Sequence, residues 1–157
     1  DTLDNIKIAD FGLARKLNDS TFYTTTDENF PLKWTAPEAF VIFNGIEVTK
    51  QDIITSASDV WSFAVLLWEL YASGLDPYSP FPSSELYHML TEENYRLPNP
   101  GKCSKKIYTY MLECWNIERE SRPTFVEIHQ YFTLLMSESE QRESLSQSDT
   151  DDDYDSD

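Results

Sequence analysis

The stretch "SDVWSFAVLLWELY", residues 58–71, is apolar on nearly every side. Its first residue, Ser58, is a residue type that commonly caps the N-terminus of a helix. A helix that is apolar all round is normally buried in the middle of a domain. We therefore expect a central helix from Asp59 to Tyr71, with the rest of the fold built around it.

Three further segments are amphipathic and predict helices that pack around the central one. Ser104 precedes the second segment as a cap, and Thr124 with Glu127 forms a capping box before the third. The class of fold is therefore mainly α. The apolar faces are Leu86, Met89 and Leu90 in residues 85–92, Ile107, Tyr108, Met111, Leu112 and Trp115 in residues 105–115, and Phe125, Ile128, Phe132 and Leu135 in the last segment.

The residues before the central helix have two other patterns. Residues 5–9 alternate, with Ile6 and Ile8 on one face, which predicts a short strand running into Asp10. Residues 18–29 carry almost nothing apolar and predict a long surface loop. Loops of this length are usually functional or disordered, so this one needs an explanation.

The net charge of −16 is divided unevenly along the chain. From Ser137 onward, nine acidic residues and one Arg carry −8 of it. This balance argues against nucleic acid and anionic membranes as partners, because both would be repelled. We expect residues 1–136 to form one globular unit and residues 137–157 to form a disordered acidic tail.

Cysteine usage and hydropathy indicate a cytoplasmic setting. The two cysteines, Cys103 and Cys114, are too few for a disulfide framework, which favours a reducing compartment and buried thiols. No stretch reaches the roughly 20 apolar residues of a membrane-spanning helix, so we expect no direct membrane insertion. The chain starts at Asp1 rather than at Met, which suggests a fragment of something longer.

Several short motifs follow one another in order along most of the chain. They are DFGLAR (10–15), PLKWTAPEA (31–39), SDVWSFAVLLWEL (58–70), PY (77–78), YRLPNP (95–100), MLECW (111–115) and RPTF (122–125). Asp-Phe-Gly alone is weak evidence, but the ordered set resembles the C-terminal half of a protein-tyrosine kinase domain, of the cytoplasmic, non-receptor type. The resemblance implies the C-terminal lobe of the protein kinase-like fold, incomplete.

The Asp-Phe-Gly motif implies a role for each of its residues. By resemblance, Asp10 holds Mg²⁺ against the phosphates of ATP, so ATP and Mg²⁺ are the expected cofactors. Phe11 would pack inward and set whether Asp10 points at the metal ion. Gly12 would let the backbone turn between the arrangement in which Asp10 points at the metal ion and the one in which it does not. The structural alternative is that Asp10 only caps a turn.

The polar loop resembles the activation loop of the family, residues 13–37. Its candidate phosphorylation site is Tyr23, modified by an upstream kinase or by autophosphorylation, and Arg15 resembles the cation that pairs with the phosphate. In many relatives the tyrosine falls at the position of Phe22. An exposed Tyr23 without a regulatory role therefore stays open as the alternative.

The motif PLKW resembles the sequence that separates tyrosine kinases from serine/threonine kinases. It implies a platform for protein substrates that carry tyrosine, although Trp34 could also, or instead, pack in the core. The platform residues are Pro31, Leu32, Lys33, Trp34 and Thr35.

Three residues resemble structural anchors of the family. Glu38 and Arg122 resemble a buried ion pair between the end of the activation loop and a late helix. Asp59 resembles a carboxylate that accepts hydrogen bonds from the catalytic loop; alternatively, or in addition, it complements the dipole of its helix. Ala64 stands where relatives have Gly, and the segment between Glu38 and Asp59 is longer than usual in the family.

No catalytic residue is expected within the chain, because nothing matches the glycine-rich loop, the ATP-anchoring lysine or the catalytic base. By resemblance these lie N-terminal to Asp1. The parent protein would transfer the γ-phosphate of ATP to protein tyrosines in signalling, while this chain alone would be inactive. The alternative is a non-catalytic pseudokinase or scaffold module that binds partners through the activation segment and the acidic tail.

Four further expectations concern the tryptophans, the central helix, the histidines and the tail. Trp61, Trp68 and Trp115 should lie in the core, and the central helix should leave a large apolar patch exposed. His88 and His129 have no metal-ligand spacing, so surface or satisfied core positions are expected. In the tail, Ser148 and Thr150 resemble phosphorylation sites of acidophilic kinases. Tyr154 lies among acidic residues, as the tyrosines of tyrosine-kinase substrates often do. The alternative is a tail that only improves solubility.

Overall fold

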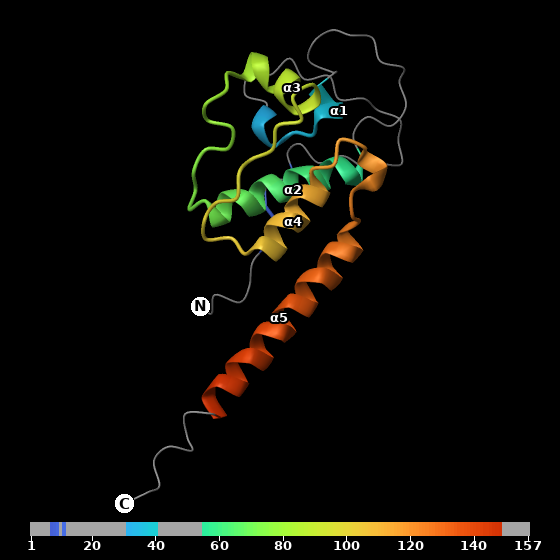
Figure 1. Cartoon of the computed structure of the whole chain (residues 1–157). Coiled ribbons are helices and arrows are strands. Elements are labelled where there is room, and N and C mark those ends of the chain that lie inside the picture. Colours follow the sequence, from blue (N-terminus) through green and yellow to red (C-terminus); the bar gives the residue numbers. More distant parts are fainter. Residues whose placement is uncertain (1–6, 10, 12–30, 41–54, 149–157) are drawn as a thin grey trace, which may run out of the picture.

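The structure, a computed structural model, describes residues 7–9, 11, 31–40 and 55–148. Within these residues it is helical and contains no strand, as the predicted mainly α class requires. Figure 1 shows a body made by the first helices and a last helix that projects from it. The elements are η2 (Leu32–Trp34), α1 (Pro37–Phe40), α2 (Ser56–Tyr71), α3 (Ser83–Thr91), α4 (Lys105–Cys114), η3 (Arg119–Ser121) and α5 (Phe125–Ser148).

Helix α2 is the predicted central helix, but it begins earlier than predicted. Its N-cap is Thr55, not Ser58: the Thr55 side chain accepts a hydrogen bond from the Ala57 amide at 3.2 Å. Ser58 instead accepts from the Thr55 amide at 3.2 Å, which completes a reciprocal capping box. A box of this kind satisfies more backbone donors than a single cap, so it fixes the start of the helix one turn upstream.

The core lies between α2 and α4, which pack against each other in the middle of the body (Figure 1). Trp61 of α2 and Trp115 at the end of α4 are fully buried, and Met111 lies beside them in the same cluster. Trp68 is also buried, and its indole Nε1 donates to the Pro98 carbonyl oxygen at 2.7 Å. The predicted core tryptophans are therefore confirmed.

Part of α2 nevertheless faces solvent. Leu66 is 50% exposed and Leu70 is 69% exposed, one helical turn apart on the same face. The neighbouring Phe63 is half-buried, with its ring 6.0 Å from that of Phe125. Two apolar side chains of the central helix are therefore exposed, and the large apolar patch stays a prediction.

Helices α3 and α4 match their predicted faces in most positions. Leu86 and Leu90 of α3 are buried, and Ser104 caps α4 by accepting from the Ile107 amide at 3.3 Å. Leu112, predicted to belong to the buried stripe of α4, is 38% exposed. It follows Met111, which is fully buried in the core, and successive residues on a helix are turned by about 100°.

Helix α5 begins at the predicted capping box. The Thr124 amide donates to Glu127 Oε2 at 2.7 Å, and the Glu127 amide donates to Thr124 Oγ1 at 3.3 Å. Ile128 is buried as predicted, but Phe125 is 43% exposed and was wrongly assigned to the buried face. Phe125 lies in the first turn of α5, where its ring contacts that of the half-buried Phe63 at a centroid distance of 6.0 Å, and this contact leaves much of the Phe125 side chain open to solvent.

The last helix is also longer than predicted. Residues 137–148 were expected to begin a disordered tail, but α5 continues to Ser148. Glu, Gln and Arg are good helix formers, and Lys106 of α4 contacts Glu138 at 2.7 Å, which ties this part of α5 to the body. The rest of the expected tail, residues 149–157, lies outside the described residues. Of the helices described, none is both long and apolar enough to cross a membrane.

The predicted strand at residues 5–9 is not present in its described part. Residues 7–9 do not form a strand, and Ile8 is 85% exposed; Asn5 and Ile6 lie outside the described residues. A strand needs a hydrogen-bonded neighbour, and the described part of the chain provides none for this segment.

Candidate functional site

Residues Pro31–Thr35 form a compact turn on the surface of the body. The Trp34 amide donates to the Pro31 carbonyl oxygen at 3.0 Å, and the Thr35 amide donates to that of Leu32 at 3.0 Å. The Thr35 hydroxyl closes the turn by donating to the Pro31 carbonyl oxygen at 2.9 Å. Since η2 packs against both α2 and α3, the five predicted platform residues lie together as one short, braced segment.

Two side chains of this turn are held by carboxylates from distant parts of the sequence. Trp34 Nε1 donates to Glu69 Oε2 of α2 at 3.2 Å. The ammonium group of Lys33 forms an ion pair with Asp76, which follows α2. Sequence reasoning missed both partners, because they lie 35 and 43 positions away and no spacing rule connects them.

The predicted ion pair between Glu38 and Arg122 is present. The guanidinium donates two parallel hydrogen bonds, from Nη1 to Glu38 Oε1 at 2.7 Å and from Nη2 to Oε2 at 2.9 Å. Arg122 is buried and also donates to the Ala57 carbonyl oxygen at 2.9 Å. The Ser58 hydroxyl donates to Glu38 Oε1 at 2.9 Å. Helix α1 is therefore fastened to the start of α2 and to the segment before α5.

The environment of Glu38 keeps its carboxyl group ionised. Burial by itself raises the pKa of Glu38, but the hydrogen bonds and the positive charge of Arg122 outweigh burial. The net result is a pKa below the ordinary value of a glutamate. The pair is thus charged on both sides at neutral pH.

Arginine side chains also surround the core tryptophan of α2. The guanidinium carbon of Arg96 lies 5.0 Å from the centre of the Trp61 ring, and that of Arg122 lies 5.1 Å from it. Arg96 Nε donates to the Trp115 carbonyl oxygen at 2.8 Å. These contacts link the Glu38–Arg122 pair to the core through cation–π interactions.

Asp59 lies in the first turn of α2 and is exposed at its surface. No described residue donates a side-chain hydrogen bond to its carboxylate, and partial burial raises its pKa. Its position complements the helix dipole. The expected anchoring of a catalytic loop by Asp59 stays a prediction.

The residues of the Asp-Phe-Gly motif are mostly beyond the described ranges, as are Arg15 and Tyr23. Asp10 and Gly12 lie outside the described residues, while Phe11 is 67% exposed. No described helix covers the Phe11 ring, and its expected role beside Asp10 stays a prediction. Among the described residues, no three His, Cys, Asp or Glu side chains are close enough to hold a metal ion. Both His88 and His129 are exposed.

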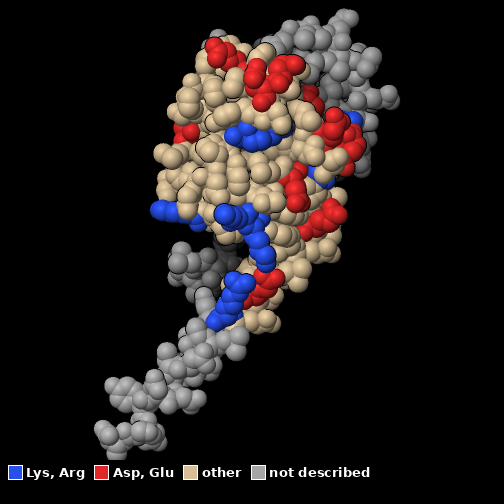
Figure 2. Space-filling view, viewed as in Figure 1, with Lys and Arg blue, Asp and Glu red and all other residues tan. Residues whose placement is uncertain are grey.

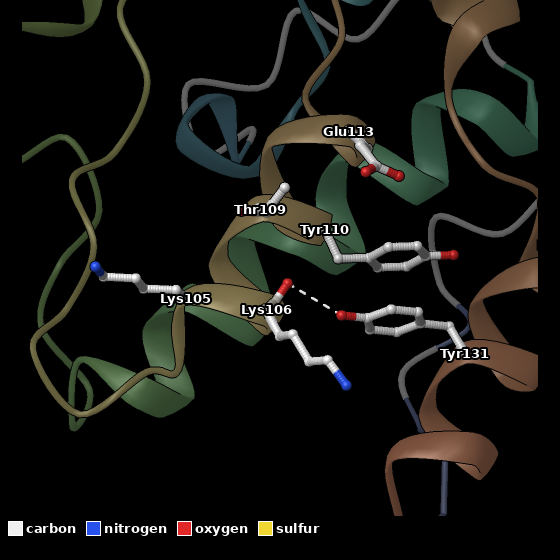
Figure 3. Close-up of a pocket in the computed structure, with 6 residues that line it drawn as sticks. All are labelled: Lys105, Lys106, Thr109, Tyr110, Glu113 and Tyr131. Carbon is white, nitrogen blue, oxygen red and sulfur yellow. Dashed lines mark hydrogen bonds between the residues drawn. The ribbon is translucent and has the colours of Figure 1, made fainter.

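A shallow groove of about 390 Å³ lies between α4 and α5, away from the predicted site residues. Figure 3 shows the Tyr110 and Tyr131 rings lying face to face there, with centroids 3.9 Å apart and an angle of 2° between the planes. The Tyr131 hydroxyl donates to the Lys106 carbonyl oxygen at 3.0 Å. The stacked rings hold α5 against α4, so the groove belongs to the packing of these helices.

The surface carries charges of both signs. Figure 2 shows acidic side chains at the upper end and right edge of the face it presents, with lysines and arginines between and below them. The whole chain has 28 acidic and 12 basic residues. A nucleic-acid backbone would be repelled by this balance.

Comparison with known proteins identifies the family. The family described as protein tyrosine and serine/threonine kinase matches residues 1–132. The tyrosine-protein kinase transforming protein Abl of Abelson murine leukemia virus is 40% identical over 134 residues, which is 85% of this chain and 17% of that protein. The tyrosine-protein kinase Abl of Drosophila melanogaster is 39% identical over 134 residues, covering 85% of this chain and 8% of its own length.

A receptor is similar to the chain as well. Fibroblast growth factor receptor 1 of Xenopus laevis is 40% identical over 146 residues, covering 92% of this chain and 17% of the receptor. The chain thus spans less than a fifth of the length of each of these relatives. The matches agree with the helical body described above. The chain therefore belongs to the protein tyrosine and serine/threonine kinase family, and its helical structure is that of a part of the kinase C-terminal lobe.

Proposed function

We propose that the chain is part of a protein-tyrosine kinase whose complete form transfers the γ-phosphate of ATP to tyrosines of protein substrates. The observation that carries this proposal is the braced turn at Pro31–Thr35, where Lys33 and Trp34 are each held by a carboxylate. A turn that is fixed on both sides can present a constant surface to a peptide. This turn contains the motif PLKW, residues 31–34, which resembles the corresponding sequence of tyrosine kinases.

In this proposal the turn is the peptide platform, made by Pro31, Leu32, Lys33, Trp34 and Thr35. The Glu38–Arg122 pair keeps the platform in place, because it fastens the segment that directly follows it. A positioned substrate is what a phosphotransferase needs most, since most of its rate enhancement comes from orientation and charge stabilisation. The platform residues thus act by placing the tyrosyl ring.

Asp10 is the proposed ligand of Mg²⁺, with Phe11 and Gly12 as the switch beside it. Support comes from the Asp-Phe-Gly motif and from the chemistry of the donor, since hard cations such as Mg²⁺ prefer carboxylate oxygens. Bound Mg²⁺ and ATP would supply charge neutralisation and the phosphate donor.

Regulation is proposed at Tyr23. A phosphate there would add a charge of about −1.5 to −2, and Arg15 is the proposed partner of that charge. An upstream kinase or a second copy of the same kinase would add the phosphate. We place the parent protein in the cytoplasm, and support comes from Cys103 and Cys114, which are both free and buried.

The chain by itself is proposed to be inactive. It carries no match to the residues that hold the adenine nucleotide or take the proton from the substrate, and positioning without them gives no transfer. The test is transfer of radiolabelled phosphate from ATP to poly(Glu,Tyr) and, in parallel, to an uncharged tyrosine peptide. We expect none from the 157-residue chain, and activity above an Asp10→Asn control would contradict the proposal.

The same assay on the longer gene product tests the family function. Extending the coding sequence upstream of Asp1 should reveal a His-Arg-Asp motif with an Asn five residues later. Protein that includes this motif should transfer phosphate to tyrosine, and Asp10→Asn should abolish the transfer. Ser or Asn in place of the motif's Asp, together with no activity, would favour a scaffold.

A further inference from the structure

Asp76 is held in place from both sides. Before it, the chain leaves α2 through Ser73 and Gly74, which have φ angles of 59° and 78° in the left-handed region. The Gly74 amide donates to the Glu69 carbonyl oxygen at 2.9 Å, which closes the end of the helix. After Asp76, Pro77 and Tyr78 are both fully buried. This reversal directs the carboxylate of Asp76 back to the Pro31–Thr35 turn.

The ion pair that results changes the charge of the turn. Lys33 is the basic residue of the turn, and its side chain is 23% exposed, while that of Asp76 is 55% exposed. Glu69 adds a second carboxylate through its hydrogen bond to Trp34 at 3.2 Å. Among the described residues, the turn therefore carries one ammonium group, on Lys33, and is contacted by two carboxylates, those of Asp76 and Glu69, which together give a charge of −1.

We propose that Asp76 is a specificity-determining residue of the peptide platform, which neutralises Lys33 and selects neutral or basic tyrosine peptides over acidic ones. The inference rests on the proposed function of the turn. A free Lys33 would attract acidic residues that flank a substrate tyrosine. Lys33 in its ion pair with Asp76 attracts acidic residues less. The second carboxylate, that of Glu69, repels acidic residues of the peptide.

The sequence of the protein provides a matched pair of probes. The acidic probe is a synthetic peptide that copies residues 149–157, DTDDDYDSD. The neutral probe is the same peptide with every Asp replaced by Asn. Binding of each to the ¹⁵N-labelled 157-residue chain is measured by NMR from the amide signals of Leu32–Thr35. The quantity of interest is the ratio of the two dissociation constants.

We expect the wild-type chain to bind the neutral peptide more tightly than the acidic one. Asp76→Asn should shift the ratio towards the acidic peptide by about two- to fivefold, the size expected for a partly exposed charge pair. Asp76→Glu keeps the charge and should restore the wild-type ratio. In a Lys33→Gln background the effect of Asp76→Asn should shrink, because Asp76 acts through Lys33.

The control variant is Glu140→Gln, which removes one negative charge from the exposed part of α5. It should leave the ratio unchanged, whereas an equal shift in this variant would mean that net charge alone is responsible. If the neutral peptide binds but Asp76→Asn does not change the ratio, the proposed role of Asp76 is contradicted, while the proposal that Pro31–Thr35 is a peptide platform is supported. If neither peptide moves the signals of Leu32–Thr35 in any variant, both the platform and the role of Asp76 are wrong.

Discussion

The pair formed by Glu38 and Arg122 connects the proposed platform to the core. Arg122 is 6% exposed, and its two hydrogen bonds to the carboxylate are parallel and short. The same guanidinium lies over Trp61, so one side chain bridges α1 and the centre of the molecule. Loss of either partner would leave an unpaired charge in a region with little water.

Arg122→Gln should therefore destabilise the chain strongly. Breaking a buried pair costs roughly 3–5 kcal/mol, and we expect about 2–4 kcal/mol here because part of Glu38 reaches solvent. Urea unfolding followed by tryptophan fluorescence measures the loss. Lys106→Gln is the matched control, since its pair with Glu138 lies at the surface. Equal losses in the two variants would show that burial of the pair does not matter.

The stability of the chain should also depend on the charge of Glu38. Its pKa in the folded state is lowered from an ordinary value of 4.5, so its contribution is fully present above that value. The contribution is lost as the pH falls through the lowered folded pKa. The stability difference between wild type and Glu38→Gln should thus shrink as the pH falls below about 4.5, the ordinary glutamate value. A difference that stays constant over that range would contradict this account.

Helix α5 has a buried first part and an exposed second part. Ile128 is 4% exposed and belongs to the core, whereas Leu134 is 64% exposed on the same helix. Beyond Ser137 the helix depends on intrinsic propensity and on the contact between Lys106 and Glu138. The two parts should therefore respond differently to the same kind of substitution.

Ile128→Ala should cost about 2–4 kcal/mol, because it removes buried methyl groups and leaves a cavity. Leu134→Ala should change the free energy of unfolding by no more than about 0.5 kcal/mol, as exposed positions usually do. Both are measured by urea unfolding. If Leu134→Ala were the more harmful of the two, the assignment of the buried face of α5 would be wrong.

The molecule as a whole combines a well-packed centre with apolar side chains at its surface. Trp61 and Trp115 are fully buried, yet Leu66 and Leu70 of the central helix are open to solvent. Ordered tryptophans should give a clear near-UV dichroism signal. Adjacent exposed leucines should bind a hydrophobic dye at the same time, without the loss of packing that a molten globule shows.

Replacing Leu66 and Leu70 together by Gln should lower the binding of such a dye without lowering the unfolding midpoint. The control replaces Leu134 and Met136 by Gln; these are also exposed but point to different sides of α5. Dye fluorescence should fall more in the α2 variant, because its two side chains adjoin. Equal changes in both variants would mean that dye binding does not report on the face of α2.

The sequence determined much of the fold by local patterns. The apolar run at 58–71 predicted α2, Ser104 predicted the start of α4, and Thr124 with Glu127 predicted the start of α5. Each of these signals acts within a few residues, through side-chain caps and helical spacing. The family resemblance added the Glu38–Arg122 pair, which no local pattern contains.

Only the tertiary structure decided how far these elements extend and which side chains meet. It placed Asp76 on Lys33 and Glu69 on Trp34, contacts that span 43 and 35 positions of the chain. It also left Leu112 and Phe125 exposed, although their patterns predicted burial. Spacing shows which residues share a face of a helix, but whether another element covers that face depends on the packing of the whole chain.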